Sequence, residues 1–116
     1  KELQSWESLG ISEDSSAIFV KSFMDDFYLV SAKDGEIISN WDINYGLDTM
    51  PSEPVEIDGN ILFGGKNGYI YSINKNGSYS PIIFTGTARV HSIQNFDDKK
   101  LAASNMDGTI IVFKMK

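Results

Sequence analysis

The sequence holds few side chains that could combine into a catalytic or metal-binding group. His91 is the only histidine and cysteine is absent, so the chain cannot supply a histidine pair or a thiolate metal site. Serines are present, but none of them stands in a motif that marks a nucleophile. We predict no catalytic residues, no metal and no cofactor, and we expect this chain alone to be non-catalytic.

Acidic and amide side chains recur at Asp25-Asp26, Asn67 and Asp107. Carboxylates are ligands that suit calcium, but a calcium site needs its oxygens to converge on one point. These residues occupy equivalent turn positions in successive stretches of similar sequence, where Asp and Asn are favoured by the backbone. We therefore interpret them as turn formers.

The longest connection, residues 42–54, is a candidate for binding a partner. Long loops on a rigid scaffold are where binding residues tend to lie. Trp41 and Tyr45 supply aromatic surface there, and Asp48 supplies a carboxylate. The alternative is a proline-fixed turn that packs its own aromatic side chains.

The composition limits the partners that the chain can bind. Its formal charge is −6, from 16 acidic and 10 basic side chains. Contacts with phosphates need clustered Lys and Arg, so we exclude a nucleic acid. The longest apolar run, residues 110–113, is far too short to cross a bilayer, so we predict no membrane span.

The elements that carry these side chains are internal repeats. Residues 61–74 align without a gap with residues 101–114, at an offset of 40 residues. An earlier copy, residues 18–30, precedes the first of these by 43 residues. The dipeptide Asn67-Gly68 aligns with Asp107-Gly108, and such pairs between apolar runs are a strong hairpin signal, because Asn and Gly tolerate positive φ.

Each repeat contains more than one hairpin. A short apolar piece precedes each hairpin, at residues 9–11, 55–57 and 90–93, and an extended segment follows two of them, at residues 36–41 and 79–84. Four strands in about 40 residues is the period of a β-propeller blade. We predict three repeat units in a single propeller segment, at residues 8–41, 54–84 and 90–116.

Burial distinguishes this architecture from a β-sandwich. A sandwich strand alternates apolar and polar side chains, because one of its faces meets water. Residues 61–63 and 110–113 are apolar at consecutive positions, so we expect both faces of those two strands to be covered. Sheets stacked around an axis cover both faces, and we predict an all-β fold of about three four-stranded antiparallel blades. Arg89 and His91 stand at the start of an innermost strand, where they could face a ligand in the channel, although a purely structural histidine is the alternative.

Residues 59–77 resemble the pyrroloquinoline-quinone-like (PQQ-like) repeat, with a small pair at Gly64-Gly65, Asn67 before Gly68, and a Tyr-small-aliphatic ending. Residues 27–38 resemble the same ending, continued into the family's Thr-Gly-Glu turn. The resemblance implies a β-propeller and a periplasmic or extracellular, bacterial protein.

The chain departs from the family's catalytic members at the docking position. In quinone-dependent dehydrogenases a tryptophan follows the Thr-Gly turn and docks each blade onto the next. The matching positions here are Ser39 and Pro81, with Trp41 two residues beyond the first, and Ser31 stands where the motif prefers Asp. These departures indicate a likeness to non-catalytic members, such as bacterial outer-membrane assembly lipoproteins.

The resemblance implies a binding or scaffolding module that presents loops or a channel to a protein or a glycan. The alternatives are a fragment of a PQQ-dependent oxidoreductase and an accessory propeller fused to an enzyme such as a phosphoesterase. Three blades cannot close a ring, because propellers carry four to eight. We therefore expect an incomplete ring, whose partners are further blades before Lys1 or a second copy of the chain.

Overall fold

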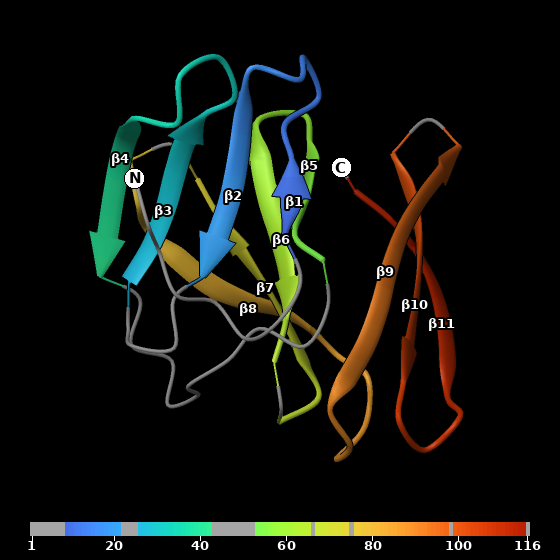
Figure 1. Ribbon diagram of the computed structural model, residues 1–116. Helices are drawn as coiled ribbons and strands as arrows, with labels where there is room; N and C mark the ends of the chain where they lie inside the picture. Colours follow the sequence, from blue (N-terminus) through green and yellow to red (C-terminus); the bar gives the residue numbers. More distant parts are fainter. Residues whose placement is uncertain are drawn as a thin grey trace.

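The computed structural model describes residues 9–21, 26–42, 53–65, 67–74, 76–97 and 99–115. These residues form three antiparallel sheets and no helix (Figure 1). The first sheet contains β1 (Gly10–Ile11), β2 (Ala17–Lys21), β3 (Asp26–Ser31) and β4 (Ile37–Asp42). The second contains β5 (Val55–Ile57), β6 (Asn60–Gly64), β7 (Tyr69–Ile73) and β8 (Tyr79–Phe84). The third contains β9 (Val90–Asp97), β10 (Lys100–Asn105) and β11 (Ile110–Lys114).

Each sheet is a meander in which consecutive strands are neighbours. This arrangement confirms the predicted strand order, with four strands in the first two sheets and three in the described part of the third. The first strands of successive sheets contact each other, β1 with β5 and β5 with β9. The three sheets stand side by side in Figure 1 and do not close a ring. No helix in the described ranges is long and apolar enough to cross a membrane.

The hairpin turns place residues with a positive φ in two different ways. At the two aligned turns only the glycine adopts a positive φ, 85° at Gly68 and 93° at Gly108, while Asn67 and Asp107 do not. Both residues of a turn are positive at Asp58 (55°) and Gly59 (83°), between β5 and β6. The hairpins predicted at the two aligned turns are confirmed, since β6 pairs with β7 and β10 pairs with β11. The connection from β6 to β7 is longer than two residues, and longer loops need only one residue with a positive φ.

The first and second sheets meet in an aromatic interface. Phe27 of β3 packs against Phe63 of β6, with ring centroids 6.0 Å apart, and Phe63 stacks on Tyr71 at 5.5 Å. Trp41 of β4 stacks on Phe27 at 6.1 Å and packs against this cluster. The indole also covers Gly77 in the turn before β8, where a Cβ would lie 2.8 Å from Trp41 Cγ. A tryptophan therefore does dock the first sheet onto the second, two residues beyond the position that the family pattern uses.

The second and third sheets meet in an aliphatic interface. Its buried members are Ile57, Leu62, Ile70, Val90, Ile93, Leu101 and Ala103. A backbone hydrogen bond also joins the same two sheets. The Val90 N–H donates to the Gly65 carbonyl at 3.0 Å. The Thr85 hydroxyl donates to the Gly68 carbonyl at 2.7 Å, and the Asn105 amide donates to the Thr85 carbonyl at 3.0 Å, so these buried polar groups are satisfied.

Strand β6 of the second sheet is covered on both faces, whereas strand β11 of the third sheet is covered on one face. Ile61, Leu62 and Phe63 of β6 are all buried, which confirms that both faces of this strand are covered. The same prediction for residues 110–113 was wrong. Ile110 and Val112 of β11 are 72% and 62% exposed, because no sheet in the described part of the chain lies beyond the third one.

Candidate functional site

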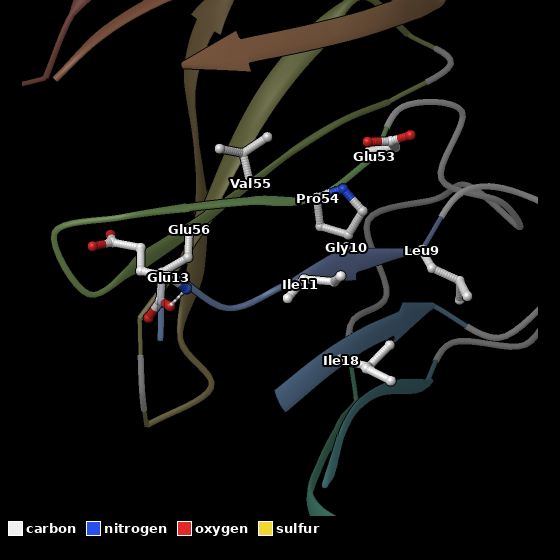
Figure 2. A pocket seen from close by; sticks show the side chains of 9 residues that line it. All are labelled: Leu9, Gly10, Ile11, Glu13, Ile18, Glu53, Pro54, Val55 and Glu56. Carbon is white, nitrogen blue, oxygen red and sulfur yellow. Dashed lines mark hydrogen bonds between the residues drawn. The ribbon is translucent and has the colours of Figure 1, made fainter. Parts of the chain in front are cut away.

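A groove lies between the inner strands of the first and second sheets. It has a volume of about 500 Å³, within the usual size range of binding pockets (Figure 2). Its apolar lining comes from Leu9, Ile11, Ile18, Pro54 and Val55, and its carboxylates are Glu13, Glu53 and Glu56. Leu9 and Ile11 are 53% and 63% exposed, so the groove offers apolar surface to a bound molecule.

Close backbone packing holds the two walls together. Gly10 of β1 lies directly against Pro54, since a Cβ at this position would overlap the Pro54 carbonyl oxygen. Only glycine fits this approach, which explains why β1 begins with Gly10 rather than with a branched residue. The groove is therefore set by the backbone of β1 and of the segment leading into β5.

Two glutamates fix the other end of the groove by reciprocal hydrogen bonds between the sheets. The Glu13 N–H donates to Glu56 Oε1 at 2.8 Å, and the Asp58 N–H donates to Glu13 Oε1 at 2.7 Å. Each carboxylate thus accepts a backbone N–H from the neighbouring sheet. These bonds join the turn after β1 to the strand and turn that follow Pro54, so this end of the groove is formed in advance of binding.

The electrostatic character of the groove is acidic. None of the nine described residues that line it is basic. The nearby Lys99 ammonium is paired with Asp58, with Nζ 3.0 Å from Oδ2. In the adjoining turn, hydrogen bonds from the Ser16 side chain and N–H and from the Ser12 hydroxyl lower the pKa of Asp14 to about 2. The Asp14 carboxylate is therefore ionised at neutral pH.

Arg89 and His91 lie on the third sheet, away from the groove. Arg89 is half-buried just before β9, and its carbonyl accepts the Met106 N–H at 3.0 Å. His91 is exposed in β9. Arg89 and His91 are two residues apart in the chain, and neither lines the groove.

Trp41 lines a second cavity, of about 330 Å³, between the first two sheets, together with Phe19, Leu29 and Asp14. Its indole is half-buried against the second sheet and so has a packing role. The other two candidates from this connection, Tyr45 and Asp48, lie outside the described residues.

The side chains of Asn67 and Asp107 accept hydrogen bonds from residues of their own turns. Asn67 Oδ1 accepts the Tyr69 N–H at 3.2 Å, and Asp107 Oδ1 accepts the Thr109 N–H at 2.9 Å and its hydroxyl at 2.7 Å. Bonds from Thr109 lower the pKa of Asp107. Among the residues that the structure describes, no group of three or more His, Asp or Glu could hold a metal ion.

Sequence reasoning missed the groove, although it identified both strands that build it. The repeat alignment placed residues 9–11 and 55–57 at equivalent positions. The missing step was that Leu9 and Ile11, apolar residues just before and within the two-residue edge strand β1, stay exposed in the folded chain. The close approach of Gly10 to Pro54 is a tertiary contact that no local pattern indicates.

The architecture defines an all-β protein of the β-propeller class, with blade-like sheets that do not close a ring. No protein-family model matches the sequence, and a search of curated proteins gives no match. Among solved structures, the chain is similar to BamB from Moraxella catarrhalis, with a TM-score of 0.75 and 22% sequence identity. The likeness covers 98% of this chain and 33% of BamB, so the chain spans about a third of that protein's length. At this identity the likeness shows the fold.

Proposed function

We propose that this chain is a set of PQQ-like propeller blades that acts as a non-catalytic protein-binding scaffold within a larger assembly. Its units are residues 8–41, 54–84 and 90–116. We further propose a periplasmic or extracellular location, which the resemblance to this repeat family implies.

The observation that carries the proposal is the open face of the third sheet. In the second sheet, Leu62 and Ile70 are fully buried beneath the third sheet. The equivalent positions one repeat later are Ala102 and Ile110, and Ile110 is 72% exposed. A face that is buried in one blade and open in the next is suited to being covered by a further sheet.

Two features support membership of the PQQ-like repeats. The fold likeness to BamB covers nearly the whole chain. In addition, Trp41 packs on Gly77 and docks the first sheet onto the second. A tryptophan docks neighbouring blades in the same way in the quinone-dependent dehydrogenases. We propose that the open face of the third sheet binds another β-sheet, either a further blade or one in a second copy of the chain.

The test is the mass of the chain in solution as its concentration rises. We expect the chain to self-associate when no further blades are present, since the open face has no other cover. Replacing Ile110 and Val112 together by Lys would raise the apparent dissociation constant at least about tenfold, because two apolar contacts are lost. Light scattering after size-exclusion chromatography measures this change.

The control is Ile38→Lys, which places a single lysine at another exposed isoleucine, on β4. This variant should associate like the wild type. A chain that stays monomeric at every concentration contradicts the proposed role of the face, as does equal association of all three proteins.

A further inference from the structure

The outer edge of β11 distinguishes the third sheet from the other two (Figure 1). In the first and second sheets a fourth strand, β4 or β8, pairs with the third strand. The third sheet runs β11-β10-β9, and in the described ranges no strand lies beyond β11. The backbone N–H and C=O groups of an edge strand can pair with an added strand. The first two sheets therefore serve as internal templates for what would occupy this edge.

One backbone donor has an equivalent position in all three sheets. In the first sheet, the Ser31 N–H donates to the carbonyl of Glu36, just before β4, at 2.8 Å. In the second, the Asn74 N–H donates to the carbonyl of Ser78, just before β8, at 3.0 Å. These two donors are related by the repeat offset of 43 residues, and the offset of 40 residues leads from Asn74 to Lys114. The Lys114 N–H is therefore the donor at which a fourth strand of the third sheet would begin.

The pairing between β10 and β11 shows which backbone groups face the outer edge. The Met115 N–H donates to the carbonyl of Lys99, just before β10, at 2.9 Å, and the register of the two strands is continuous. Backbone groups alternate in direction along a strand of an antiparallel pair. The N–H groups of Ile110, Val112 and Lys114 therefore point away from β10, toward the edge.

The burial of side chains in β11 fits an edge that is open. Val30 and Ile73 are buried at equivalent positions of the first two sheets, whereas Phe113 of β11 is only half-buried. Phe113 already packs against the interface with the second sheet. Ile73 has an additional neighbour in the adjacent strand, because Tyr79 of β8 pairs with it and packs against the same cluster. An added strand would give Phe113 the neighbour that β8 gives Ile73.

The templates also indicate which side chain an added strand needs. In the first sheet, Trp41 of β4 pairs with Phe27 and packs toward the second sheet. In the second sheet, Ile83 of β8 pairs with Ile70 and packs toward the third sheet. The equivalent position of β11 is Ile110, which is 72% exposed. A large apolar side chain opposite Ile110 would cover part of it, because directly opposed side chains in a sheet lie within about 5.5 Å.

We propose that the outer edge of β11 binds an extended segment of another protein, which joins the third sheet as a fourth, antiparallel strand. This segment places a large apolar side chain opposite Ile110. Backbone hydrogen bonds to Ile110, Val112 and Lys114 give the affinity, and the apolar side chain gives the selectivity. The edge consists of backbone groups, whereas the proposed function concerns side chains on the open face. The two surfaces are therefore tested by different changes.

The probe is a fluorescent peptide with the sequence of residues 36–42, Glu-Ile-Ile-Ser-Asn-Trp-Asp, because this segment forms the fourth strand of the first sheet. It is titrated with the whole chain and followed by anisotropy. We expect saturable binding with the tryptophan opposite Ile110. A peptide with serine in place of the tryptophan should bind at least about fivefold more weakly, since the apolar contact is lost.

N-methylated peptides test whether binding uses the backbone. Ser39 and Trp41 pair with residues of β3 that point their backbone groups toward β4, so methyl groups on the corresponding two peptide amides block the pairing edge. This peptide should bind at least about tenfold more weakly, because two hydrogen bonds are lost. Methyl groups on the amides that correspond to Asn40 and Asp42 lie on the opposite edge. This matched control should bind within about twofold of the unmodified peptide.

Two variants of the chain locate the peptide. Val112→Pro removes an N–H that points outward and keeps the hydrogen bonds to β10, and proline is tolerated at such positions of edge strands. We expect it to weaken binding at least about fivefold. Val112→Thr keeps both the N–H and the branched shape, and should bind within about twofold of the wild type. Urea unfolding of both variants checks that the third sheet is intact.

Three results would overturn the proposed site. The first is the absence of saturable binding, and the second is equal affinity of the two N-methylated peptides. The third is equal binding to Val112→Pro, which would place the peptide on another edge of the chain. Self-association that Val112→Pro abolishes and Val112→Thr retains, without peptide binding, would instead assign the edge to a second copy of the chain and would equally overturn it.

Discussion

Asp14 shows how a single exposed carboxylate is tuned by its turn. Its Oδ1 accepts the Ser16 hydroxyl at 2.6 Å, the Ser16 N–H at 2.9 Å and the Ser12 hydroxyl at 2.8 Å, and these bonds lower its pKa from 3.8 to about 2. We predict that Ser16→Ala, which removes the largest of these contributions, raises the pKa of Asp14 toward 3.8. Titration of the carboxyl carbon by NMR measures it.

The sign of the linked pH dependence follows from the direction of this shift. The folded state binds fewer protons at Asp14 than the unfolded state between pH about 2 and 3.8. The stabilisation from Asp14 is therefore complete above this window and is lost as the pH falls through it. Asp107 is the internal control, because its pKa is lowered by Thr109 and should not respond to Ser16→Ala. A wild-type Asp14 that titrates near 3.8 would contradict the assignment.

Gly68 and Gly35 both adopt a positive φ, but their surroundings differ. A Cβ at Gly68 would overlap the Gly86 carbonyl oxygen, whereas a Cβ at Gly35 would meet nothing within 4 Å. We predict that Gly35→Ala costs about 1–2 kcal/mol of unfolding free energy, from backbone strain alone. Gly68→Ala should cost more than about 3 kcal/mol, because the linker to the third sheet must move. Urea unfolding followed by tryptophan fluorescence compares them, and equal losses would refute the packing argument.

Among the larger elements, β4 acts on its neighbouring sheet through one side chain. Trp41 stacks on Phe27 and covers Gly77, so it couples the first sheet to the turn before β8. We predict that Trp41→Ala costs about 2–3 kcal/mol, since the indole is half-buried. Gly77→Ala should cost at least about 1 kcal/mol more in the wild type than in the Trp41→Ala background, where the indole no longer opposes the new methyl group. A double-mutant cycle by urea unfolding measures the difference, and strict additivity would show that the two do not touch.

The positions of the strands were predictable from the sequence, because local patterns of apolar and turn residues indicate them. The run Ile61-Leu62-Phe63 and the glycine after Asn67 identified β6 and its turn, and the 40-residue offset identified the blades. Which faces are open was not predictable, because β7 and β11 are equivalent strands in the repeat, yet Ile70 is fully buried and Ile110 is 72% exposed, according to what lies next to each sheet. The groove was missed for the same reason, since the contact of Gly10 with Pro54 exists only after two sheets have packed.

In the whole molecule, the second sheet is the shared part of both interfaces. Its Phe63 faces the first sheet and its Leu62 faces the third, and both side chains are fully buried. The third sheet has one such interface and one open face. Local opening should therefore require less free energy in β11 than in β6, because fewer apolar contacts are broken.

We predict that the amides of β11 exchange with deuterium faster than those of β6 in dilute solution. If the open face is covered by another sheet, residues around Ile110 and Val112 become more protected as the concentration of the chain rises, while β6 is unchanged. The double Lys variant at these two positions should lose the concentration dependence and keep the protection of β6. Hydrogen exchange followed by mass spectrometry distinguishes these results in one experiment. Equal protection of β6 and β11 in dilute solution would mean that the three sheets open as one unit and that the open face leaves β11 no weaker than the middle of the stack.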